Sequence, residues 1–255
     1  MKYDKSELLS ETIEHVDIKS FDSTPIIDSM RKMSFTARDT ARAADILNMM
    51  VNEEGCTNIL TLAGSTSAAG CMQVYVDMVK SNMIDAIVAT GASIADMDFF
   101  EALGFRHYKG SPFVDDSGLR EVYIDRIYDT YIDEIQLQEC DGTIKKIADS
   151  LAPRPYSSRE FIKEMGKYLV KNAKKKDSLV QVAYEHNVPI FCPAFSDSSA
   201  GFGLVKHQYE RRGKPSVSID SVKDFWELTE IKMQSRTSGL FMVGGGVPKN
   251  FAQDT

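Results

Sequence analysis

The chain contains 255 residues, of which 43% are hydrophobic, so it is long and apolar enough to build a sizeable core. Its formal net charge of −7 at pH 7 argues against nucleic acid or an anionic membrane as the main partner. The same charge suits a cationic substrate.

The first 33 residues are polar and irregular, with Pro25 between short apolar patches. We expect residues 1–33 to form an arm that packs on the body of the protein or on a neighbouring subunit. The arm has no apolar segment of the kind found in secretory signals, and no apolar run in the chain approaches the ~20 residues that span a bilayer. A cytoplasmic location without a membrane partner is therefore predicted.

Residues 34–255 are expected to form the folded domain, which begins with a helix. Apolar side chains recur at helical spacing over residues 34–51. Thr36 and Asp39 have the spacing of a capping box, which predicts an ordered start for this helix. Similar apolar spacing predicts further helices at 72–79, 178–185 and 222–234.

Short apolar runs alternate with these helices, and each run ends in a loop of small residues. This alternation is typical of an α/β fold with a mostly parallel sheet and helices on both faces. The predicted strands cover residues 58–63, 84–90, 188–194 and 239–243. The loops that follow them cover residues 64–70, 91–93, 195–201 and 244–246.

The small-residue loops predict a ligand site, because α/β folds bind ligands beyond the carboxyl ends of their strands. Glycine lets backbone N–H groups approach a ligand closely, and serine and threonine add hydroxyl donors. Four such loops in one chain favour a ligand the size of a nucleotide. By contrast, residues 105–176 are rich in Asp, Tyr and Arg, and the acidic stretch within them lacks the spacing of a calcium loop and is expected at the surface rather than in a metal site.

Several common catalytic and metal-binding patterns are missing from the sequence. It contains no G-x-G-x-x-G, no Walker A lysine motif and no G-x-S-x-G. No two of its four histidines have the spacing of metal ligands. The four cysteines form no C-x-x-C pair, which indicates a reducing compartment without a zinc site or disulfide framework. Any dinucleotide must therefore be held by a different set of loops.

Two acidic residues beside the loops have two possible roles. Asp197 follows a predicted buried strand in a loop of serine and glycine. It could accept hydrogen bonds from ribose hydroxyls or bind a cationic group, or it could be a turn residue that bonds its own backbone. Asp96, close behind Gly91, has the same two interpretations.

The ordered set of loops resembles deoxyhypusine synthase, and more closely its prokaryotic deoxyhypusine-synthase-like relatives. The matching segments cover residues 64–70, 81–91, 188–197 and 243–249, and their order and spacing agree over most of residues 35–255. The resemblance implies a Rossmann-like NAD-binding fold and a homotetramer with sites at subunit interfaces. It also implies oxidation of spermidine by NAD, loss of 1,3-diaminopropane and transfer of the 4-aminobutyl group through a lysine imine to an amine.

The resemblance assigns roles to individual residues. An amine substrate would contact Asp96 and Asn250. The acceptor would be a small amine or a lysine of a protein. The NAD contacts that the resemblance implies are Gly64, Ser65, Thr66, Ser67, Ala68, Thr90, Gly91, Ala92, Asp197, Gly244, Gly245 and Gly246.

The sequence departs from the family pattern at positions that hold the polyamine. The family's two consecutive glutamates correspond to Ala95 and Asp96, an acidic position corresponds to Phe202, and a histidine corresponds to Asn250. A polyamine site needs carboxylates to pair with separated ammonium groups. The departures therefore suggest a different amine donor or acceptor.

The imine-forming lysine of the family lies in a Trp-Gly-Lys-type segment, which we expect beyond Thr255; Lys249 matches a non-catalytic family position. We therefore expect the domain to be incomplete at its C-terminus, with no catalytic residue in residues 1–255. The predicted function is NAD-dependent aminobutyl transfer, and the alternative is a non-catalytic NAD-binding subunit that supports an active partner. A sirtuin-like deacylase is disfavoured because paired zinc cysteines are missing.

Overall fold

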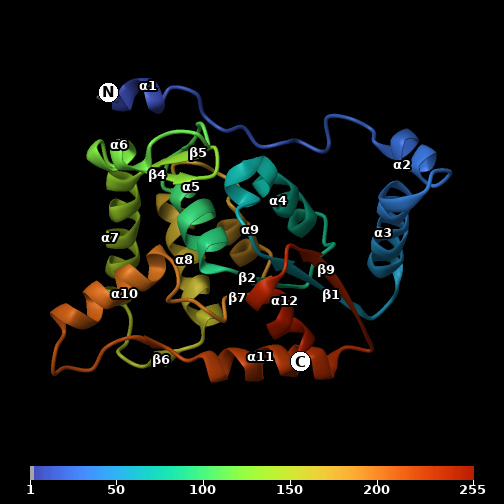
Figure 1. Ribbon diagram of the computed structural model, residues 1–255. Helices are drawn as coiled ribbons and strands as arrows, with labels where there is room; N and C mark the ends of the chain where they lie inside the picture. Colours follow the sequence, from blue (N-terminus) through green and yellow to red (C-terminus); the bar gives the residue numbers. More distant parts are fainter. Residues whose placement is uncertain (1–2) are drawn as a thin grey trace.

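The computed structural model describes residues 3–255, which are built around a four-stranded sheet in the order β7-β2-β1-β9 (Figure 1). Every neighbouring pair in this sheet is parallel, as the sequence predicts. The four residues of β2 are all buried, which fits its unbroken apolar run. The strands are β1 (Cys56–Leu62), β2 (Ala86–Ala89), β7 (Ile190–Phe191) and β9 (Thr237–Val243).

Helices cover both faces of this sheet, because alternate side chains of each strand point in opposite directions. On one face, Leu60 and Ile87 belong to a large core formed with α4, α7, α8, α9 and the π-helical turn η2. On the other face, Ile59 and Val88 pack with α11 and α12. The helices are α4 (Met72–Lys80), η2 (Ala92–Phe99), α7 (Glu134–Ser150), α8 (Ser158–Asn172), α9 (Leu179–Glu185), α11 (Ser221–Gln234) and α12 (Gly246–Gln253).

Two predicted boundaries are wrong for identifiable reasons. The third strand is limited to β7, because Pro189 and Pro193 flank it and proline has no N–H to donate to a sheet. The predicted capping box is also wrong, because α3 (Phe35–Asn52) has Ser34 as its N-cap and makes no side-chain capping bond. Thr36 and Asp39 therefore lie inside the first turns of α3.

The predicted loop at 195–201 is shorter than expected, because α10 (Ser199–Glu210) already begins within it. The loop contains serines and Gly201, and Gly203 follows it on α10; these small residues are typical of a loop, yet glycine also allows close packing of helices. A Cβ atom added to Gly203 would lie 2.7 Å from the carbonyl oxygen of Asp141 on α7. The small residues therefore bring α10 against α7, which a local pattern does not reveal.

The N-terminal arm crosses one side of the molecule from α1 (Lys5–Leu8) to α2 (Thr24–Met30), and α11 lies along the opposite side (Figure 1). Ile13 N donates to His107 O at 2.9 Å, and Val16 N donates to Gly70 O at 2.9 Å. The arm thus contacts the body of the chain and contains two short helices that the sequence did not predict. Its contact with a neighbouring subunit stays a prediction.

Residues 105–176 contain an antiparallel sheet and two long helices, α7 and α8, that the sequence did not predict, and both helices contribute buried side chains to the core. Within residues 3–255 no helix is both long enough and apolar enough to cross a bilayer. The remaining elements are η1 (Ser67–Cys71), α5 (Phe100–Ala102), β3 (His107–Lys109), α6 (Asp116–Glu121), β4 (Ile124–Ile127), β5 (Thr130–Asp133), β6 (Pro155–Tyr156) and β8 (Ser218–Ile219).

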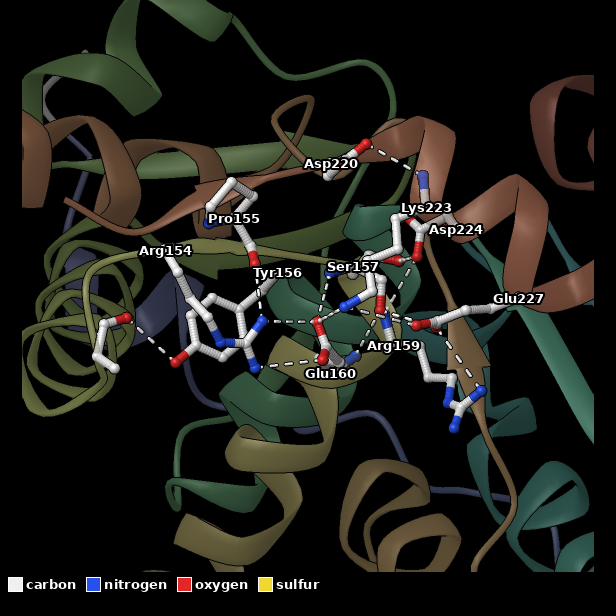
Figure 2. Close-up of polar contacts among 12 residues, drawn as sticks. Arg154, Pro155, Tyr156, Ser157, Arg159, Glu160, Asp220, Lys223, Asp224 and Glu227 are labelled. Atoms are coloured by element: carbon white, nitrogen blue, oxygen red, sulfur yellow. Dashed lines mark hydrogen bonds and ion pairs between the residues drawn. The ribbon is translucent and has the colours of Figure 1, made fainter. Parts of the chain in front are cut away.

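A polar network fastens α11 to the start of α8 (Figure 2). Ser157 Oγ donates to Glu227 at 2.9 Å, and Lys223 Nζ lies 2.7 Å from Glu160. In the same network, Ser158 Oγ donates to the buried Asp224 at 2.9 Å. Burial raises the pKa of Asp224 to about 6, and the bonds from the start of α8 oppose this rise. The network fixes α11 to the start of α8 and so holds α11 over one face of the sheet.

Candidate functional site

The loops that follow the strands lie side by side at the carboxyl edge of the sheet. Thr90 N donates to Leu62 O at 3.0 Å, which joins the ends of β2 and β1. Ala63 N donates to Val243 O at 2.9 Å, which joins the ends of β1 and β9. We call residues 64–70, 90–92, 195–198 and 244–246 the strand-end loops. They overlap the predicted loops 64–70, 91–93, 195–201 and 244–246, which the sequence identified as a ligand site.

Two glycines allow these loops to approach one another more closely than other residues could. A Cβ atom on Gly91 would lie 2.6 Å from Ser198 Cβ, so Gly91 brings the loop after β2 against the loop after β7. Gly244 has a φ of +77°, and its Cβ atom would lie 2.8 Å from Ala63 O. Only glycine meets both requirements at Gly244. The loops therefore form one continuous surface.

Within residues 3–255, the loop after β1 contains one hydroxyl group that is bonded to the chain and one buried hydroxyl group without a partner. Thr66 Oγ1 is bonded to the Tyr75 hydroxyl at 2.7 Å and so holds the loop on α4. Ser67 is 1% exposed, and its Oγ has no hydrogen-bond partner among residues 3–255. A buried hydroxyl without a partner is costly unless something else satisfies it. Ala68 is buried beside it, and Ser65 O accepts from Ala69 N at 3.0 Å.

A chain of hydroxyl groups ties the loop after β2 to the loop after β1. Thr90 Oγ1 donates to Ser93 Oγ at 3.0 Å, and Ser93 Oγ donates to Gly64 O at 3.2 Å. Thr90 therefore helps to hold the backbone of Gly64 in place through its hydrogen bond with Ser93. Ser93 is buried and was not among the predicted site residues, although it stands in the small-residue loop that contains Gly91 and Ala92.

Open space borders the glycines where a ligand would lie. A Cβ atom added to Gly64, Gly245 or Gly246 would meet no atom of the chain within 4 Å. These backbones can be approached by a polyanionic group, whose phosphates accept N–H bonds. Together with the unpartnered Ser67 hydroxyl, they fit a dinucleotide such as NAD.

The two acidic candidates differ in exposure. Asp197 is exposed, and its N–H donates to Ala194 O at 3.0 Å in a turn. Asp96 is partly buried and accepts a hydrogen bond from Ser199 N at 2.7 Å. Burial raises the pKa of Asp96 to about 7, the charges of Asp141 and Asp197 add to the rise, and the bonds from Ser199 oppose it. Asp96 therefore lies among carboxylates, in a place that favours a cation.

Asn250 is the second residue that the resemblance assigns to the amine substrate. It is exposed on α12, and no hydrogen bond within residues 3–255 ties its side chain to Asp96. Lys249 precedes it on the same helix. The role of Asn250 in substrate binding stays a prediction.

We expect the Asp96→Asn variant to be more stable than the wild type at pH 8 by on the order of 3 kcal/mol, because a raised pKa marks an ionised form that the fold disfavours. The folded state retains the proton more strongly than the unfolded state, so this gain shrinks as the pH falls from 8 to 5. Urea unfolding at both pH values measures it. An equal gain at both values would contradict the assigned pKa, and Asp39→Asn, an exposed change on α3, is the control.

Comparison with known proteins places this chain in a family. A family model described as deoxyhypusine synthase matches residues 25–255. A deoxyhypusine synthase-like protein of Coxiella burnetii is 67% identical over 98% of this chain and 71% of its own length. A protein of the same name from Caulobacter vibrioides is 68% identical over 98% of this chain and 69% of its own length.

A solved structure shares the fold of the chain. A crystal structure from Entamoeba histolytica, provisionally named a deoxyhypusine synthase, superposes with a TM-score of 0.67 at 19% identity. The match covers 92% of this chain and 80% of that structure. It confirms an α/β fold with a parallel sheet and covering helices.

Proposed function

The chain belongs to the deoxyhypusine synthase family, and we propose that it binds NAD and transfers a 4-aminobutyl group from spermidine or a related polyamine to an amine. In the net reaction, spermidine and an amine R–NH2 give 1,3-diaminopropane and R–NH–(CH2)4–NH2. One C–N bond breaks and another forms, so the enzyme is a transferase of alkyl groups. The cofactor is regenerated in each cycle.

The observation that carries this proposal is the buried Ser67 hydroxyl without a partner, next to open glycine backbones at the carboxyl edge of the sheet. NAD, when bound, supplies the acceptor for a hydride. In our proposal the backbone N–H groups of the loops containing Gly64 and Gly245 hold its phosphates, and the Ser67 hydroxyl bonds one of its polar groups. Asp197, which is exposed beside them, accepts hydrogen bonds from ribose hydroxyls.

The substrate amine lies next to these loops in the same proposal. Asp96 pairs with an ammonium group and so orients the polyamine. Ala95 and Phe202 provide no carboxylate where the family does, and Phe202 is 66% exposed on α10. In our proposal these departures favour a donor related to spermidine or an acceptor other than a protein lysine.

The proposal includes a homotetramer in the cytoplasm. Phe202, Val205 and Tyr209 are exposed along one side of α10, and burial of such side chains in a subunit contact would be favourable. The four free cysteines support a reducing compartment.

Release of 1,3-diaminopropane tests the proposed reaction. We expect the full-length protein to release it from spermidine when NAD and a suitable amine are present, and not when NAD is omitted. Chromatography of the amines measures the product. Binding of NAD without release for any amine tested would contradict the transfer and favour a non-catalytic subunit.

A further inference from the structure

A second carboxylate beside Asp96 has no adequate counter-ion. Asp141 lies on α7 and is 6% exposed, and its Oδ1 atom has no hydrogen-bond partner among residues 3–255. Its Oδ2 atom lies 3.8 Å from Lys206 Nζ, which is longer than a hydrogen bond. A buried carboxylate in this state is costly to the fold. Asp141 therefore has a free acceptor atom that a ligand could satisfy.

Asp141 and Asp96 meet at the start of α10. Ser199 is the first residue of α10, and its N–H donates to Asp96 Oδ1 at 2.7 Å. Cys140 Sγ, next to Asp141 on α7, donates to the backbone oxygen of Ala95, next to Asp96, at 3.7 Å, so the two residues come from adjoining turns of α7 and η2. The charge of Asp141 in turn raises the pKa of Asp96. The two carboxylates thus share one small region next to the strand-end loops.

More negative than positive groups face this region. The charge of Asp197 adds to the rise in the pKa of Asp96, and the charge of Glu134, two helical turns before Asp141 on α7, adds to the rise that burial causes in the pKa of Asp141. Lys206 is the cation that opposes them, and its side chain is 48% exposed. A linear molecule with two or more ammonium groups would supply the missing positive charge.

We propose that Asp141 is a second substrate carboxylate, which together with Asp96 binds two ammonium groups of a diamine or polyamine, and that Lys206 is the internal cation that the substrate displaces. The inference rests on the proposed function and deepens it. Asp141 would replace acidic groups that are missing at Ala95 and Phe202. It comes from α7 rather than from a strand-end loop, so the motif comparison did not reveal it.

The test is calorimetric titration of the full chain with spermidine, with butylamine as a probe that carries a single ammonium group. We expect Asp141→Asn to weaken spermidine binding at least about tenfold while NAD binding and thermal stability are retained. We expect butylamine to bind much more weakly than spermidine to the wild type. Asp149→Asn, on the same helix α7, is the matched control, because Asp149 already pairs with Lys145 and His207.

The result that overturns the inference is wild-type spermidine affinity in Asp141→Asn. A wild type that binds NAD but no polyamine would instead contradict the proposed function, so the two failures are distinguishable. Lys206→Met gives a second measurement that leaves Asp141 unchanged. It should bind spermidine about threefold or more tightly than the wild type, since the competing cation is lost, and weaker binding would contradict the displacement.

Discussion

Replacing Asp98 with alanine should lower the free energy of unfolding by about 3–5 kcal/mol, the largest stability loss that we expect from a single change. Asp98 is 1% exposed in η2, and its two oxygens accept from Leu179 N at 2.7 Å and Val180 N at 2.8 Å. Those groups belong to the first turn of α9, whose N–H groups have no partner within the helix. Alanine would leave both N–H groups buried without an acceptor.

The same change should disturb the site, because η2 also carries Asp96. Chemical denaturation with urea measures the loss. Asp98→Asn keeps the shape and one acceptor oxygen, so its loss should be smaller. Asp39→Ala is the control: Asp39 is exposed and 3.6 Å from Arg42, and such pairs contribute roughly 0–1 kcal/mol. A loss in Asp98→Ala no larger than that of Asp39→Ala would show that Asp98 does not hold α9.

Replacing Gly244 with alanine should weaken NAD binding at least about tenfold and cost about 1–3 kcal/mol of stability. The left-handed backbone of Gly244 disfavours a side chain by roughly 1–2 kcal/mol. The new Cβ atom would also lie 2.8 Å from Ala63 O, which forces the loops after β9 and β1 apart. Because the proposed phosphate site lies in these loops, a small displacement removes N–H bonds to the ligand.

Titration with NAD below the melting temperature of the variant separates lost binding from lost folding. Gly245→Ala is the matched control for stability, since its added Cβ atom meets nothing within 4 Å and its φ is negative. Wild-type NAD affinity in Gly244→Ala would contradict the placement of the cofactor at this loop.

Much of the fold could be predicted from the sequence because it is encoded by residues that are close to one another along the chain. Mostly apolar runs identified β1, β2 and β9, and helical spacing identified α3, α4, α9 and α11. Small residues after the strands identified the loops that the structure brings to one edge. The family resemblance rested on the same loops, and the family model confirms it.

Other elements were not predicted because the local sequence patterns that encode them are weak or misleading. The helix α10 has serine and glycine in its first turns, which are typical of a loop, and those residues serve its contact with α7. The two prolines beside β7 limit this strand, whereas its apolar composition predicted a longer one.

The sequence by itself determined a parallel α/β sheet, its small-residue loops and the family to which they belong, since these depend on local periodicity and turn chemistry. Only the tertiary structure decided which polar groups meet. Asp98 caps a helix that begins 81 residues later, and Asp141 lies beside Asp96 although 45 residues separate them. Such pairs depend on how helices cross over the sheet. Burial of their charges then costs free energy, and this cost cannot be predicted from a sequence pattern.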